Sequence, residues 1–255
     1  MVPSQRCSGR LLQISSPKRF PLNLAGLLGL VVGSAVWSGG SCRADFVVQT
    51  LDQSYVADVS SGYRAYCIWE GHRYAQTFQV GIAGTLSQVG LQVEKSAATV
   101  EEANQITEPL MLSIMSVAAN GSPGSVTLGT FAIAPSAVPT FAGFTPQFVP
   151  VDVSSAGIAV QTGQSLALVL TSALPPPPEP LTTVPTYGFI TTPEDGYAAG
   201  GGWGRPPGYG WGSLSFDFGF QTYVTPVPEP GMLSLFAVGI VPALRRLSAT
   251  AKRSR

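Results

Sequence analysis

The sequence has little charge, and only 11% of its 255 residues are Asp, Glu, Lys or Arg. It has one histidine, His72, and it contains no HExxH motif, no CxxC pair and no phosphate-binding glycine loop. A metal centre built on imidazole needs two or more histidines, and a Ser/His/Asp relay needs partners that the sequence does not place beside His72. We therefore predict a surface or hydrogen-bonded histidine, and no catalytic group stands out.

Basic side chains are scarce in the middle of the chain. Residues 45–226 contain four of them against thirteen acidic ones, a net charge of minus nine, whereas residues 1–44 and 231–255 each contain five basic and no acidic side chains. An acidic surface repels phosphate backbones. We therefore expect no binding to nucleic acid.

The first 44 residues have the order of a secretory signal. Basic residues up to Arg19 precede an apolar run at residues 20–37, and small residues follow up to Ala44. This order predicts a signal helix that signal peptidase removes between Ala44 and Asp45. An uncleaved membrane anchor is the alternative, and a lipoprotein cut at Cys42 is disfavoured because Gly39 stands where an aliphatic residue is usual.

Cysteine is too rare for a disulfide framework in the exported chain. A cut after Ala44 removes Cys7 and Cys42 and leaves Cys67 alone. We predict that Cys67 is a buried small side chain rather than a nucleophile, and that the fold depends on its core.

The last 31 residues, 225–255, end in a short apolar run and a basic tail. The run at residues 231–244 has fourteen residues and contains Pro242, whereas a helix needs roughly 20 to span a bilayer. Because Lys and Arg prefer the cytoplasmic side of an apolar segment, the basic residues 245–255 predict transient membrane association. The alternative is a terminal helix packed on the body.

Three features of this tail occur together: the motif Val227, Pro228, Glu229 and Pro230, the apolar run, and the paired Arg245 and Arg246. With the signal segment, they resemble the PEP-CTERM sorting tail of exported bacterial proteins. The resemblance implies that an exosortase, a membrane-embedded cysteine transpeptidase, cuts near Pro-Glu-Pro and passes the protein to the cell envelope or an extracellular polysaccharide matrix. The short run and Pro242 depart from the family and bear on membrane retention.

Alternation of apolar and polar residues dominates residues 45–224. It predicts strands at residues 74–80, 86–93, 110–117, 126–133, 147–153, 165–172 and 214–224, the sixth of them central because it is apolar on both faces. Residues 96–106 are a short helix with a Thr99–Glu102 capping box, or an acidic loop. Many short strands with Gly and Pro turns predict an antiparallel β-sandwich that is jelly-roll-like, flanked by the signal helix and the short apolar helix.

Five short stretches of the body carry a second resemblance: QTF with the turn that follows it (76–84), LGT (128–130), GQSLALVL (163–170), GYAAGG (196–201) and FQTYV (220–224). Their order is similar to jelly-roll modules of secreted bacterial proteins with this kind of tail. The resemblance implies the fold and no particular activity.

The glycine-rich residues 193–212 contain four aromatic side chains and three charged ones: Tyr197, Trp203, Tyr209 and Trp211, with Glu194, Asp195 and Arg205. Aromatic rings on exposed loops stack against the apolar faces of sugars, while charged groups hydrogen-bond the hydroxyls. Two interpretations follow: the aromatics cap one end of the core, or the segment is a sugar-binding loop formed by Tyr197, Trp203, Tyr209, Trp211, Asp195 and Arg205.

The one cofactor that the sequence suggests is a structural Ca²⁺, held by Asp195, Asp217 and Asp58 beside carbonyl-rich turns. We expect a non-catalytic module of the envelope or matrix that is structural or associates with polysaccharide. Two rivals remain, a lyase or hydrolase that acts on carbohydrate with acidic residues, and an adhesion module that binds protein.

Overall fold

The computed structural model describes residues 48–57, 64–140, 147–177, 184–192 and 196–227. These residues form an all-β sandwich of two antiparallel sheets, with one short helix, α1 (Val100–Asn104), and two 3₁₀ turns, η2 (Pro135–Ala137) and η3 (Ser154–Ala156). The first sheet contains β1 (Thr50–Tyr55), β2 (Arg64–Ile68), β4 (Gly84–Ser96), β7 (Phe148–Asp152), β8 (Ala159–Val160), β10 (Thr186–Thr191) and β13 (Phe220–Pro226). The second contains β3 (Arg73–Gln79), β5 (Leu110–Val117), β6 (Pro123–Ile133), β9 (Ser165–Thr171), β11 (Gly201–Arg205) and β12 (Gly212–Ser213).

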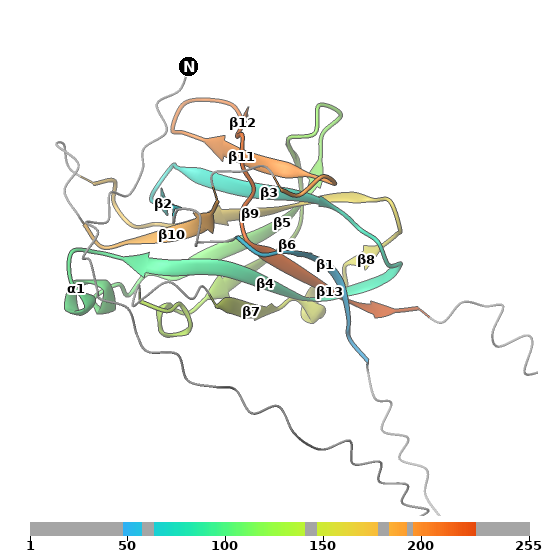
Figure 1. Cartoon of the computed structure of the whole chain (residues 1–255), viewed down its shortest axis with the longest axis horizontal. Helices are drawn as coiled ribbons and strands as arrows, with labels where there is room; N and C mark the ends of the chain where they lie inside the picture. The colour runs from blue at the N-terminus through green and yellow to red at the C-terminus, as the bar shows by residue number, and fades with distance from the viewer. Residues whose placement is uncertain (1–47, 58–63, 141–146, 178–183, 193–195, 228–255) are drawn as a thin grey trace, which may run out of the picture. The chain divides into compact units, whose positions relative to one another are not determined.

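Strand β4 organises the first sheet because its 13 residues are long enough to pair with four strands. It pairs with β13 along residues 84–91, with β10 along residues 93–96, with β7 along residues 88–92 and with β8 at residues 84–85. The second sheet runs in the order β12-β11-β3-β9-β5-β6. Figure 1 shows the two sheets as stacked layers, with β3 in one and β4 in the other.

The core lies between the inward faces of the two sheets. It contains fully buried aliphatic side chains from both, such as Leu91 of β4 and Leu168 of β9. Aromatic rings fill one part of it, where Phe189 stacks on Phe218 with centroids 4.2 Å apart. Because burying a large apolar side chain contributes about 1.5–3 kcal/mol, this core is the main source of stability.

Six of the seven predicted strands are confirmed as β3, β4, β5, β6, β7 and β9. Strand β9 lies between β3 and β5 with five consecutive buried residues, as its apolar pattern predicts. Helix α1 is also confirmed, since the Thr99 hydroxyl caps it by accepting from the Glu102 amide at 3.2 Å.

The seventh prediction is wrong in its first half, because the strand begins only at Phe220. Alternation placed Asp217 on the exposed side, yet Asp217 has no exposed surface and lies between the buried Phe216 and Phe218. The segment is irregular except for an isolated bridge between Phe218 and Thr191. Strands β1, β2, β8, β10, β11 and β12 were not predicted, since they are short, glycine-rich or lack a polar face.

Cys67 lies in β2 and is half-buried rather than buried. It is disulfide-bonded in the full chain, so it is not a free thiol there. The lone thiol was predicted for a chain cut after Ala44, and for that chain it stays a prediction.

Several predictions fall outside the described residues: the signal helix with the cut at Ala44 and Asp45, and the tail from Pro228 through Glu229, Pro230, Arg245 and Arg246 to the end. Val227, the first residue of the sorting motif, is described and is 65% exposed directly after β13. Among the described helices, none is long and apolar enough to cross a membrane.

Candidate functional site

The residues predicted to form a sugar-binding loop fall into four groups: the buried Tyr197, the half-buried Trp203 and Trp211, the exposed Tyr209 and Arg205, and Asp195 outside the described residues. Glu194 also lies outside them. The segment is not a simple loop, because it contains the short strands β11 and β12 at the edge of the second sheet.

Tyr197 belongs to the core. Its ring meets Phe220 edge-on with centroids 5.1 Å apart, and its hydroxyl donates a hydrogen bond to Oε1 of Gln53 at 2.9 Å. Burial raises the pKa of the Tyr197 phenol above its ordinary value. This side chain fills the end of the sandwich, as the capping alternative supposed, so its ring is not available for stacking on a ligand.

A buried carboxylate fixes the start of the segment that leads into β11. Oδ2 of Asp217 accepts hydrogen bonds from the amides of Gly196 at 3.1 Å and Tyr197 at 2.8 Å. Its Oδ1 accepts from the Gln76 amide group at 2.8 Å, and Oε1 of Gln76 accepts from the Phe218 amide at 2.8 Å. These charge-assisted hydrogen bonds tie β3 to two distant segments and set the path of the chain toward Trp203.

Trp203 lies on the outer face of the second sheet. It is opposite Ala75 of β3 on one side and Ser213 of β12 on the other. Ala75, Ala167 and Val169 form a small buried cluster on this face, against which four half-buried side chains pack: Met115, Val117, Trp203 and Trp211. Because these three buried side chains are small, the large Trp203 ring can pack over them on the outer face of the sheet.

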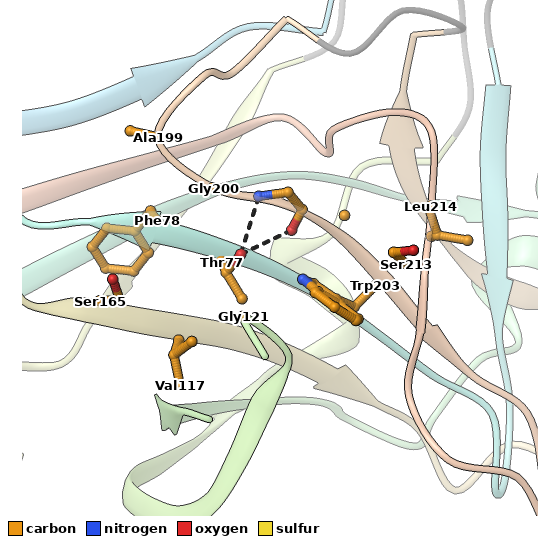
Figure 2. A pocket seen from close by; sticks show the side chains of 12 residues that line it. Thr77, Phe78, Val117, Gly121, Ser165, Ala199, Gly200, Trp203, Ser213 and Leu214 are labelled. Carbon is orange, nitrogen blue, oxygen red and sulfur yellow. Dashed lines mark hydrogen bonds between the residues drawn. The ribbon is translucent and has the colours of Figure 1, made fainter. Parts of the chain in front are cut away.

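A cleft of about 340 Å³ lies beside Trp203 (Figure 2). The backbone of residues 199–202 and the side chains of Ser213 and Leu214 line one side, and Val117 and Gly121 of the β5–β6 hairpin line the other. Thr77 and Ser165 supply hydroxyl groups from adjacent strands. None of the twelve described residues that line the cleft is charged.

The side chain of Thr77 holds β11 at the wall of this cleft. Its hydroxyl accepts a hydrogen bond from the Gly201 amide at 3.0 Å and donates one to the Gly201 carbonyl at 3.2 Å, as Figure 2 shows. A Cβ atom on Gly201 would meet nothing within 4 Å, so this backbone faces open space. At Gly200, the residue before β11, a Cβ would collide with the Thr77 carbonyl oxygen, so the chain passes β3 too closely there for any side chain.

Tyr209 and Arg205 lie outside the cleft lining. The Arg205 Nε group donates to the Tyr209 carbonyl at 3.2 Å and so closes the turn between β11 and β12. Tyr209 is 65% exposed at this turn. The structure therefore does not bring these two residues into the cleft with Trp203.

His72 differs from its prediction, because it is buried rather than at the surface and its Nδ1 has no hydrogen-bond partner. Its ring lies between Trp69 and Tyr74, with centroids 4.3 and 4.9 Å away. Burial lowers the pKa of His72 from 6.5 to about 4. The surrounding rings make it a packing residue of the β2–β3 turn.

The described residues contain no group of three or more His, Cys, Asp or Glu side chains placed to hold a metal ion. Of the three carboxylates considered for calcium, Asp58 and Asp195 lie outside the described residues, and Asp217 accepts the hydrogen bonds described above.

Of the residues that line the cleft, sequence reasoning singled out Trp203 and the glycine-rich stretch around it, and it missed Thr77, Val117 and Ser165. These residues come from strands far apart in sequence, and only the strand order of the second sheet brings them together. No protein-family model matches the chain, and no curated protein is significantly similar to it.

Proposed function

We propose that this protein is an exported, non-catalytic module of the cell envelope or matrix that binds polysaccharide in the cleft beside Trp203. The observation that carries the proposal is the pairing of a half-buried tryptophan with an uncharged cleft rich in hydroxyl and backbone groups. An aromatic face suits the apolar side of a sugar ring, and the hydroxyls of Ser165 and Ser213 suit its own hydroxyls, while the Thr77 hydroxyl holds Gly201.

The cleft favours a neutral sugar over an acidic one. None of the described residues that line it is charged, so a uronate carboxylate would lose its water there without an ionic partner among them, which is costly. Its volume of about 340 Å³ is at the lower end for ligand sites, which suits one or two sugar rings of a longer chain.

The sandwich is, on this proposal, a jelly roll. Two observed strand paths support it: β2-β10-β4-β7 in the first sheet and β3-β9-β5-β6 in the second. In each path the neighbours are antiparallel, and all of them except the β5–β6 hairpin are distant in sequence, which is the arrangement that two Greek keys produce. Strands β1, β13, β11 and β12 extend this framework, and the last two build the cleft wall.

Export and sorting follow the signals at the two ends. Residues 1–44 are removed by signal peptidase, residues 45–224 form the sandwich, and residues 225–255 are the PEP-CTERM-like tail that an exosortase processes after transient membrane association. The exposure of Val227 immediately after β13 supports this division, because a processing enzyme can reach the chain where it leaves the fold.

Affinity electrophoresis of the purified full chain tests the binding proposal, with dextran and xylan as neutral probes and alginate as an acidic one. We expect a neutral probe to retard the wild type and Trp203→Ala to lose the retardation. Tyr187→Phe is the control for a change in packing, since Tyr187 is a buried aromatic residue that does not line the cleft. Retardation that survives in Trp203→Ala would contradict the proposed site.

Mass spectrometry of the protein recovered from a producing bacterium tests the sorting proposal. We expect an N-terminus at Asp45 and a C-terminus within the Pro228–Glu229–Pro230 motif. Glu229→Ala should accumulate with its tail intact, whereas Glu108→Ala, a change at an exposed glutamate of the body, should be processed normally. A wild-type protein that keeps residues 231–255 in the envelope would contradict this proposal.

A further inference from the structure

Strand β6 forms one edge of the second sheet, and it is long and exposed. It pairs with β5 along one side, and no described strand pairs with its other side. Five of its eleven residues are exposed, including Val126 at 56%. Such an edge presents unpaired backbone donors and acceptors, which an extended strand can satisfy.

The other described edges carry features that discourage pairing. Strand β1 contains Asp52 and a register shift between Leu51 and Gln53, and β2 begins with Arg64. Strand β7 contains Pro150 and Asp152, and β12 has only two residues. These are the devices with which proteins protect sheet edges, namely charge, proline, bulges and shortness.

Strand β6 largely lacks these devices. Its sequence, PGSVTLGTFAI, has no charged residue, and its proline is at the first position. Two irregularities interrupt its pairing with β5, one around Leu128 and one between Pro123 and Thr127, but residues 129–133 pair regularly with residues 110–114. The outward side of residues 129–133 is therefore a regular, uncharged edge.

An uncharged edge favours a second copy as the partner. Residues 45–226 carry a net charge of minus nine, yet no charged residue occurs between Glu108 and Asp152. The β5–β6 hairpin lies within this uncharged stretch. Two copies can approach through β6 at the least electrostatic cost, and the same edge is present on each.

We propose that β6 pairs antiparallel with β6 of a second copy through residues 129–133, which joins two six-stranded sheets across a twofold axis. Pairing centred on Phe131 places Thr130 opposite Ala132 of the other copy, and both residues are exposed. The pairing leaves out the cleft beside Trp203, because the hairpin lines the cleft with Val117 and Gly121 near its turn, whereas the pairing uses residues 129–133. This inference does not depend on the proposed sugar binding.

Light scattering of the purified full chain over a range of concentrations tests the proposal. We expect a dimer for the wild type and a monomer for Thr130→Lys/Ala132→Lys, because lysines then face one another across the axis. Val48→Lys/Val100→Lys changes two exposed valines away from this edge and should remain dimeric. A monomeric wild type at every concentration, or equal dissociation of both variants, would overturn the proposal.

Amide hydrogen exchange of the wild type at several protein concentrations is a second test, and it needs no variant. The amides of residues 129–133 that face outward should exchange more slowly as the protein concentration rises. Exchange that is independent of concentration in a sample with dimer mass would place the contact elsewhere and would also overturn the proposal.

Discussion

At the scale of single residues, Asp217 shows how a charged side chain can be part of the core. Its two oxygens accept hydrogen bonds from Gln76, Gly196 and Tyr197, and it has no exposed surface. Alternation alone put it on the solvent side, because sequence patterns report the usual environment of a residue type and not its partners. The donors come from positions 20, 21 and 141 residues away.

Asp217→Asn should destabilise the fold by about 2 kcal/mol, since its amide group would face donors on both sides and leave a buried group unpaired. Chemical denaturation measures this loss as a lower midpoint. Asp152→Asn is the control, because Asp152 is exposed and asparagine keeps an oxygen that can accept from Ser154. Equal midpoints for Asp217→Asn and the wild type would contradict the role given to Asp217.

His72 should make stability depend on pH between about 6.5 and 4. In the unfolded chain its pKa is the ordinary 6.5, while in the fold it is about 4. As pH falls through this window the unfolded state binds a proton that the folded state does not, so the free energy of unfolding decreases. Above pH 6.5 both states are neutral at His72, and this effect is absent.

Thermal unfolding at several pH values, compared with His72→Phe, measures this contribution. The wild type should lose stability more steeply than the variant between pH 6.5 and 4, and the two slopes should agree at higher pH. Because the chain has one histidine, the difference between the curves belongs to position 72. Parallel curves over the whole range would contradict a buried neutral His72.

At the scale of elements, the strands with a clear alternating or doubly apolar pattern could be predicted, whereas the two short strands that carry Trp203 and Ser213, β11 and β12, could not. Strand β9 is a run of apolar residues and reads as a central strand. Strand β11 has the sequence GGWGR, which reads as a loop, and it is a strand because β3 pairs with it along all five residues. Tertiary pairing overrides local propensity here.

Gly200→Ala should displace β11, because the added Cβ would collide with the Thr77 carbonyl oxygen. We expect a loss of stability of about 1–3 kcal/mol, the usual cost of forcing an extra methyl group into a packed site. Gly210→Ala is the matched control, since a Cβ there meets nothing within 4 Å. Equal unfolding midpoints for the two variants would contradict the close approach of β11 to β3.

At the scale of the whole molecule, the sequence predicted an all-β sandwich from its strand patterns and its turns. It did not predict that Tyr197 would enter the core while Trp203 and Trp211 remain on the outer face of a sheet. That division depends on the order of the strands in the sheets. The alternation of apolar and polar residues does not encode this order. The aromatic segment therefore serves both the fold and the proposed site, with different residues.

The central claim is that the cleft beside Trp203 binds a neutral polysaccharide, and one calorimetric comparison tests it most directly. Dextran is titrated into the wild type, into Gly201→Leu, whose side chain enters open space at the cleft wall, and into Gly210→Leu, whose side chain enters open space at the neighbouring turn. We predict binding to the wild type and to Gly210→Leu, and a loss of about tenfold or more for Gly201→Leu. Unchanged binding by Gly201→Leu, or a folded wild type that binds neither dextran nor xylan, would contradict the claim.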